Sequence, residues 1–138
     1  MKKYLAIDYG LKRTGLATGD DFTKTTGPVG AIVTTSIDEL IIQIKKAIDE
    51  HDPDELVIGI PYNMDGSLSP QAQKSEDLAV RLENETGLVV NRMDERLTSY
   101  AANEMMRESG LTHKQKKARR DALAAMAILQ DFLDQLST

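Results

Sequence analysis

The segment that most restricts the fold is a short apolar run at residues 55–60, which reads Glu-Leu-Val-Ile-Gly-Ile. Such a run suits a strand buried on both faces, as in parallel sheets, where crossover helices cover both faces. Helical patterns flank the run at 37–51 and 70–86. The first begins with a capping box, and the second begins with a serine-proline cap and ends before a glycine. The sequence therefore predicts an α/β protein with helical crossovers.

The N-terminal part of the chain predicts strands joined by tight turns. Residues 3–9 alternate with a period of two and are mostly apolar on both faces, which favours a central strand. A turn at 10–15 leads to a second strand at 16–18 and a third at 29–35, and the short links imply antiparallel hairpins. Another strand opens at Leu88. We expect a mixed five-stranded sheet, three N-terminal antiparallel strands plus parallel crossovers, between helices.

Two further helices are expected after the sheet. Thr98 or Ser99 would cap a helix that ends at Gly110, and a basic loop follows it. Residues 119–136 would form the last helix, whose middle is apolar on nearly every side, so we expect it to pack into the body of the protein. The pattern shows no linker or repeat, and we predict a single domain over residues 1–138.

Composition excludes several classes of protein. A hydrophobic share of 41% with 28% charged residues is typical of a packed fold rather than a disordered chain. The absence of cysteine excludes disulfides, zinc thiolate clusters, iron–sulfur centres and a cysteine nucleophile. No apolar run approaches the roughly 20 residues of a membrane span or resembles a signal peptide, so we expect a cytoplasmic protein without a membrane partner.

Charge is distributed unevenly along the chain. The net charge is −5, yet residues 107–120 contain six basic side chains and one acidic side chain. This window carries +5, and the rest of the chain therefore carries −10. A basic segment beside an acidic body can hold a polyanion or can be a solvated loop, and composition leaves both interpretations open.

Acidic residues stand where burial would normally exclude them. Asp8 ends one buried strand, Asp94 and Glu95 end another, and Asp121 shares an apolar helical stripe. An unpaired buried carboxylate is costly, so each needs a cation, hydrogen-bond donors or access to water. Because ligands gather at the carboxyl ends of parallel strands, these acids could hold hard cations such as Mg²⁺. Two ions about 3.5 to 4 Å apart would suit hydrolysis of a phosphodiester.

Each acid also has an ordinary structural interpretation. Asp8 can be a turn residue, and Asp121 can be an acid that the helix dipole favours near a helix N-terminus. Asp94 and Glu95 should face opposite ways on a strand, so only one of them can point into a shared site. Acids at three such positions in one chain favour the metal hypothesis over these separate interpretations.

Other polar positions are candidates for substrate contact. Gly10, Arg13 and Gly15 surround a turn beyond the first strand, where glycine lets a backbone approach a phosphate. Asn63 follows the buried strand and could meet substrate or simply form a turn. The two histidines lack metal-ligand spacing. Only six aromatic residues occur, which favours backbone contacts over extensive base stacking.

Four blocks of the sequence resemble the YqgF family, also called RuvX. They are Ala-Ile-Asp8-Tyr-Gly10-Leu-Lys-Arg13-Thr-Gly15, Val-Ile-Gly59-Ile-Pro61-Tyr-Asn63-Met-Asp65-Gly66, Asp94-Glu95-Arg96-Leu97-Thr98, and Asp121-Ala-Leu-Ala-Ala-Met-Ala-Ile-Leu-Gln. The resemblance covers essentially the whole chain. It implies an RNase H-like fold related to RuvC-type resolvases, and a metal-dependent nuclease. The family is described as a Holliday junction resolvase and as a nuclease that processes the 5′ end of the precursor of 16S rRNA.

The resemblance also implies roles for individual residues. Asp8, Glu95 and Asp121 would be the catalytic metal ligands for two Mg²⁺ or Mn²⁺ ions, with Glu95 preferred to Asp94. Gly59-Ile-Pro61 stands where related resolvases carry an acid at the end of the fourth strand. Substrate would be held by charge and backbone contacts rather than base reading. The residues assigned to this role are Gly10, Arg13, Asn63, Arg96, Lys117 and Arg120.

The resemblance leaves the substrate and the oligomeric state open. The partner would be structured RNA or branched DNA, bound by a monomer or a homodimer. Two alternatives to an RNA-processing nuclease on this fold are a Holliday junction resolvase and a non-catalytic RNA-binding module. An ATPase related to actin and sugar kinases would share the turn Asp8-Tyr-Gly10, but those proteins close two such domains around the nucleotide.

Overall fold

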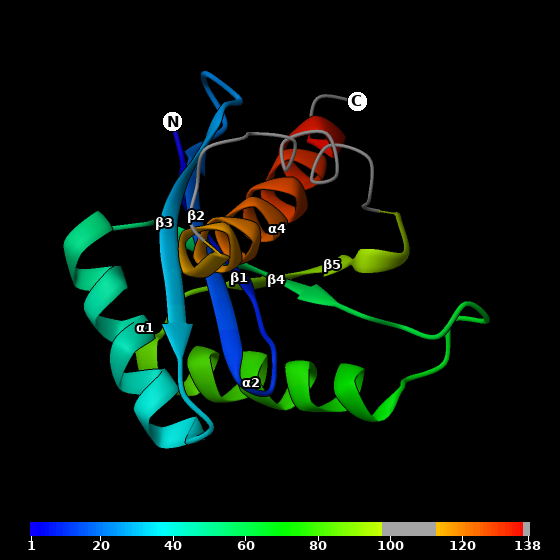
Figure 1. The fold of residues 1–138 in the computed structure, drawn as a ribbon. Helices are drawn as coiled ribbons and strands as arrows, with labels where there is room; N and C mark the ends of the chain where they lie inside the picture. The colour runs from blue at the N-terminus through cyan, green and yellow to red at the C-terminus, as the bar shows by residue number, and fades with distance from the viewer. Residues whose placement is uncertain (98–112, 137–138) are drawn as a thin grey trace.

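The computed structural model describes the backbone of residues 1–97 and 113–136, and the side chains of residues 1–96 and 119–136. The helix expected between Thr98 or Ser99 and Gly110 lies outside the described residues. Five strands form one sheet in the order β3-β2-β1-β4-β5 (Figure 1). The strands are β1 (Lys3–Asp8), β2 (Arg13–Asp20), β3 (Thr26–Val33), β4 (Glu55–Ile60) and β5 (Val90–Asp94).

The sheet has the mixed topology expected from the sequence. β1 pairs antiparallel with β2, and β2 pairs antiparallel with β3. β4 lies between β1 and β5 and runs parallel to both. The predicted fold class is therefore confirmed. The carboxyl ends of β1, β4 and β5 meet at one edge of the sheet, the edge at which parallel strands place ligands.

Three helices and a short 3-10 turn complete the described chain. They are α1 (Ile37–His51), α2 (Pro70–Thr86), η1 (Glu95–Leu97) and α4 (His113–Gln135). The Ser36 side chain accepts a hydrogen bond from the Glu39 amide at 3.2 Å, and Ser69 caps α2 in the same way. Gly87 ends α2 in the left-handed region, with φ of 72°. The predicted bounds of α1 and α2 are confirmed.

The helices cover the two faces of the sheet separately. One core cluster joins α1 and α2 to one face through side chains such as Ile44 and Leu82 packed on Ile7 and Ile58. The other joins α4 to the opposite face, where Ile128 and other α4 residues pack on residues of the strands. Figure 1 shows α4 crossing in front of the strands, with α1 at the left and α2 along the bottom of the view. Among residues 1–97 and 113–136, no helix has the length and apolarity that a membrane crossing requires.

Several predicted strand bounds were wrong. β2 extends well beyond the expected 16–18, and β3 covers 26–33 instead of 29–35. Gly27 and Pro28 lie inside β3, which is possible because β3 is the edge of the sheet, where a proline need not donate to a neighbouring strand. A register shift in the β2–β3 pairing at Leu16/Ala17 absorbs the irregularity.

The expected start of the last helix was also wrong. Residues 114–118 were interpreted as part of a basic loop, whereas α4 begins at His113 and includes them. Lysine, glutamine, alanine and arginine are good helix formers, and no glycine or proline interrupts 113–135. The basic segment therefore belongs to the first turns of a helix rather than to a loop.

Candidate active site

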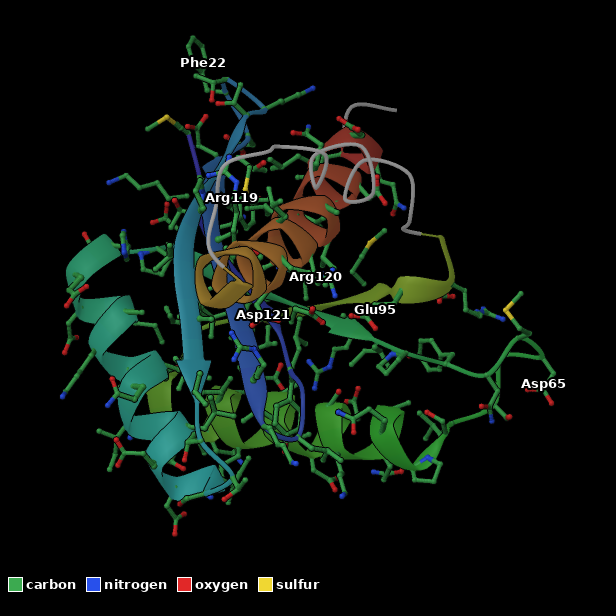
Figure 2. All side chains as sticks on the ribbon, viewed as in Figure 1. Phe22, Asp65, Glu95, Arg119, Arg120 and Asp121 are labelled. Atoms are coloured by element: carbon green, nitrogen blue, oxygen red, sulfur yellow. The ribbon has the colours of Figure 1, made fainter. Side chains whose placement is uncertain are left out.

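The three acids assigned to metal binding come from three elements on the same face of the sheet. Asp8 is the last residue of β1, Glu95 begins η1 directly after β5, and Asp121 lies in α4, which covers this face. In Figure 2 the labelled Glu95 and Asp121 lie near the centre of the molecule, whereas Phe22 and Asp65 lie at its margins. The fold thus gathers side chains that are up to 113 positions apart in the chain.

Asp8 and Glu95 contact each other through a side-chain hydrogen bond. Burial is the main reason why the pKa of Asp8 lies above its usual range, and the negative charge of Asp121 raises it further. Burial, then the charge of Asp8, raises the pKa of Glu95 to about 8. The two carboxyl groups therefore hold a proton between them near neutral pH, with Glu95 donating to Asp8.

Asp121 is held by an arginine. Its Oδ2 atom accepts from Arg13 Nε at 2.6 Å, and the two side chains retain 21% and 32% of their exposure. The family resemblance implies that Arg13 binds a phosphate and that Asp121 binds a metal. In this structure the two side chains neutralise each other, so their contact competes with both roles.

Glu95 and Asp94 have different surroundings. Asp94 forms a bidentate ion pair with Arg96, with Nη2 to Oδ2 at 2.6 Å, and this arginine lowers the pKa of Asp94. Glu95 lies beyond the strand end, in η1, and turns toward Asp8. Of the two neighbouring acids, the structure brings only Glu95 into contact with Asp8.

Arg96 also fastens the loop that follows β4. Its Nη1 atom donates to the carbonyl of Met64 at 3.1 Å, and its guanidinium lies 5.8 Å from the ring centre of Tyr62. Within the loop, the Asn63 side chain donates to Ser67 Oγ at 3.0 Å. Arg96 and Asn63 therefore hold this loop in place at the end of the sheet.

The remaining predicted substrate contacts lie around the acids. A side chain at Gly10 would collide with the carbonyl oxygen of Arg13, so glycine is required by the tight turn between β1 and β2. Arg120 is exposed in α4, directly before Asp121. The backbone of Lys117 lies in α4, but its side chain lies outside the described residues.

Gly15 and Gly59 shape the site by allowing close approach of other elements. A side chain at Gly15 in β2 would collide with the backbone of Asp121, so this glycine lets α4 approach the sheet. A side chain at Gly59 in β4 would collide with Glu95. A glycine inside an otherwise apolar strand is the available sequence signal for such a close approach.

The donor set suits a hard divalent cation. Carboxylate oxygens are the preferred protein ligands of Mg²⁺ and Mn²⁺, and a cation would satisfy the buried Asp8–Glu95 pair in place of its shared proton. Within the part of the chain that the structure describes, however, no three His, Asp or Glu side chains form a ready metal cluster. The donor chemistry of Asp8, Glu95 and Asp121 nevertheless fits such a metal.

Comparison with known proteins agrees with this architecture. The chain superposes on Thermus thermophilus RuvC in complex with a Holliday junction with a TM-score of 0.62 and 12% identity, covering 100% of this chain and 98% of that one. For the fowlpox virus resolvase with its junction DNA, the TM-score is 0.63 at 10% identity, covering 99% of each chain. These likenesses show the RNase H-like fold of the resolvases.

Sequence comparison identifies the family. An Anaeromyxobacter dehalogenans protein is 35% identical over 131 residues, 95% of this chain and 96% of its own length. A Geobacillus protein is 36% identical over 137 residues, covering 96% of this chain and 97% of its own length. Both are described as "Putative pre-16S rRNA nuclease". The family model "RuvX: Holliday junction resolvase" matches residues 2–135, and the chain therefore belongs to the RuvX family.

Proposed function

We propose that this protein is a metal-dependent nuclease, formed by one domain over residues 1–138, that processes the 5′ end of the precursor of 16S rRNA in the cytoplasm. The observation that carries the proposal is the buried contact between Asp8 and Glu95, with the charge of Asp121 beside it. Two carboxyl groups in contact are unfavourable unless a proton or a cation lies between them. The choice of an RNA substrate follows the descriptions of the relatives.

In this proposal Asp8, Glu95 and Asp121 hold one or two Mg²⁺ or Mn²⁺ ions. When bound, such ions supply Lewis-acid activation of water and stabilise negative charge on the phosphate and the leaving oxygen. To hold such an ion, Glu95 would release to solvent the proton that it shares with Asp8, and Asp121 would turn its carboxylate toward the ion. The Arg13 guanidinium would then pair with the phosphate of the substrate.

Electrostatic attraction brings the substrate to the site. Lysines and arginines occupy the first turns of α4, where the helix dipole disfavours positive charge. The helix dipole therefore does not account for the position of these charges, whereas a polyanionic partner does. Lys117 and Arg120 would contact the backbone of the nucleic acid, and the loop that contains Asn63 would lie against it.

A second candidate activity is the resolution of Holliday junctions, which the description of the family model favours. A resolvase must cut two strands symmetrically, so this activity requires a homodimer, whereas an RNA-processing enzyme can act as a monomer. Both activities use the same acids, and the choice between them depends on the substrate that is cut.

Cleavage of two labelled substrates tests the proposal. The substrates are an RNA with the extended 5′ end of 16S rRNA and a synthetic four-way DNA junction, each with Mg²⁺ or Mn²⁺ and with the Asp8→Asn protein as control. We expect cleavage of the RNA alone, absent from the control. Symmetric nicking of the junction alone would support a resolvase. Metal-independent RNA binding with no cleavage of either substrate would overturn the nuclease proposal in favour of a binding module.

A further inference from the structure

Glu95 reaches Asp8 across a strand that separates them. The sheet order places β4 between β1 and β5, so the strand that ends before Glu95 is not a neighbour of the strand that ends in Asp8. The two side chains nevertheless share a hydrogen bond. The Glu95 side chain must therefore lie over the backbone of β4.

The point that it crosses is Gly59. In the parallel register Ile58 is opposite Ile7, and Gly59 is opposite Met93, so Gly59 lies level with the end of β1. A Cβ atom built on Gly59 would collide with Glu95 Oε1 and would lie 2.8 Å from Glu95 Cγ. The same atom would lie 2.6 Å from Cδ1 of Ile128 in α4. Glu95 occupies the space that a side chain at position 59 would otherwise fill.

Backbone conformation does not require this glycine. The glycines with φ in the left-handed range within the described residues are Gly30, Gly66 and Gly87, and Gly59 is not among them. Glycine inside a strand is unfavourable relative to alanine, because it has more conformational freedom to lose. The close approach of Glu95 and Ile128 is what accounts for a glycine at this position.

We propose that Gly59 is a positioning residue that admits Glu95 to the metal site. The inference rests on the proposed function, because it assumes that Glu95 and Asp8 bind the same cation. Any side chain at position 59 separates the two carboxyl groups and leaves a site with one acid fewer. Gly59 itself touches neither metal nor substrate in this proposal.

The test replaces Gly59 with alanine and reads out both the position of Glu95 and Mn²⁺ affinity. We expect the crystal structure of metal-free Gly59→Ala protein to show Glu95 turned away from Asp8. Calorimetry should show Mn²⁺ binding about 10- to 100-fold weaker than in the wild type, the range found when groups that orient metal ligands are removed. Gly27→Ala is the matched control, because a Cβ atom at that strand glycine meets nothing within 4 Å.

A double variant separates the effect on Glu95 from crowding of the core. Ile128→Val removes the Cδ1 atom that the new Cβ would contact, so Gly59→Ala/Ile128→Val relieves the core while keeping the collision with Glu95. We expect this double variant to bind Mn²⁺ as weakly as Gly59→Ala. Recovery of wild-type affinity in the double variant would overturn the proposal, as would an intact Asp8–Glu95 contact in the Gly59→Ala structure.

Folding of the variant is also informative. If Gly59→Ala does not fold, we expect Gly59→Ala/Glu95→Ala to fold, since shortening Glu95 removes its collision with the new Cβ. Failure of both proteins to fold would show that Gly59 serves the core alone and would overturn the proposal. Wild-type protein that binds no Mn²⁺ would contradict the proposed function, whereas the metal-free structure of Gly59→Ala would still decide the role of Gly59.

Discussion

The Asp8–Glu95 contact predicts how the stability of the metal-free protein depends on pH. The pKa of Glu95 is raised from 4.5 to about 8 by burial and by Asp8, so the folded state binds more protons than the unfolded state between these values. The stabilising contribution is therefore complete below about pH 4.5 and is lost as the pH rises toward 8. Urea unfolding with a chelator should show the wild type losing stability from pH 5 to pH 8.

Glu95→Gln is the reference for this measurement, because glutamine cannot titrate. Other groups contribute equally to both proteins, so the difference in unfolding free energy between wild type and Glu95→Gln isolates the pair. As the pH rises, we expect the unfolding free energy of the wild type to fall relative to that of Glu95→Gln. A difference that stays constant between pH 5 and pH 8 would contradict the shared proton.

Replacement of Asp8 by asparagine tests its assignment as a metal ligand. Asparagine keeps the shape of the side chain and removes the negative charge, so the fold should persist while metal-dependent cleavage falls by at least about 100-fold. Cleavage rates and thermal unfolding measured together check both expectations. Asp49→Asn, at an exposed position of α1 on the far face of the sheet, should cleave like the wild type. A folded Asp8→Asn protein with full activity would refute the assignment.

At this scale the sequence predicted that acids from three places would converge, but not their partners. Asp8, the Asp94–Glu95 pair and Asp121 stood out because acids are unusual at buried strand ends and in apolar helical stripes, and only the family resemblance favoured Glu95 over Asp94. The ion pair of Arg13 with Asp121 joins residues 108 positions apart, and no local pattern indicates it. The space at Gly59 likewise depends on how η1 lies over β4, which is a property of the folded sheet.

At the scale of the elements, Arg96 holds the loop that follows β4. This side chain joins Asp94 to the carbonyl of Met64, so the loop is tied to the strand that precedes Glu95. Arg96→Gln removes the forked ion pair and should loosen the loop without removing a metal ligand. We expect KM for nucleic acid to rise about tenfold, since charge-assisted contacts are worth about 1.5 to 3 kcal/mol, while Mn²⁺ affinity stays within about twofold.

Arg81→Gln is the control for this loop prediction. Arg81 also forms ion pairs, with Asp38 and Glu85, but it lies on α2, which covers the other face of the sheet. Its replacement should leave both KM and Mn²⁺ affinity near their wild-type values. Equal losses of Mn²⁺ affinity and substrate affinity in Arg96→Gln would show instead that Arg96 supports the metal site directly.

Element bounds followed from the sequence where capping signals were strong. Ser36 and Ser69 marked the starts of α1 and α2, and both caps form in the structure. The start of α4 was missed because the run of positive charge in its first turns was interpreted as a loop. The start of β3 was missed because the strand includes Gly27 and Pro28, and edge position, which tolerates proline, is decided by the order of strands in the whole sheet.

For the whole molecule, an acidic protein must attract a polyanion through a local basic surface. The chain carries a net charge of −5, while lysines and arginines are concentrated at the start of α4. Each phosphate contact contributes about 0.7 to 0.9 to the slope of log affinity against log salt concentration. In a nucleic-acid binding titration, we therefore expect Arg120→Gln to reduce the magnitude of this slope by about 0.7 to 0.9, the contribution of one phosphate contact.

Lys46→Gln provides the comparison for the salt titration. Lys46 is an exposed lysine of α1 on the far face of the sheet, so its replacement changes the net charge equally without touching the proposed interface. Its slope should match that of the wild type. Identical slopes for Arg120→Gln and Lys46→Gln would place the nucleic acid elsewhere on the protein.

The most direct test of the central claim is a crystal structure of the protein with Mn²⁺, located by its anomalous scattering. We predict manganese bound by Asp8, Glu95 and Asp121, with Arg13 no longer paired with Asp121. Manganese at another place, or no manganese while Arg13 still holds Asp121, would contradict the account of this acidic cluster as a metal-dependent nuclease site.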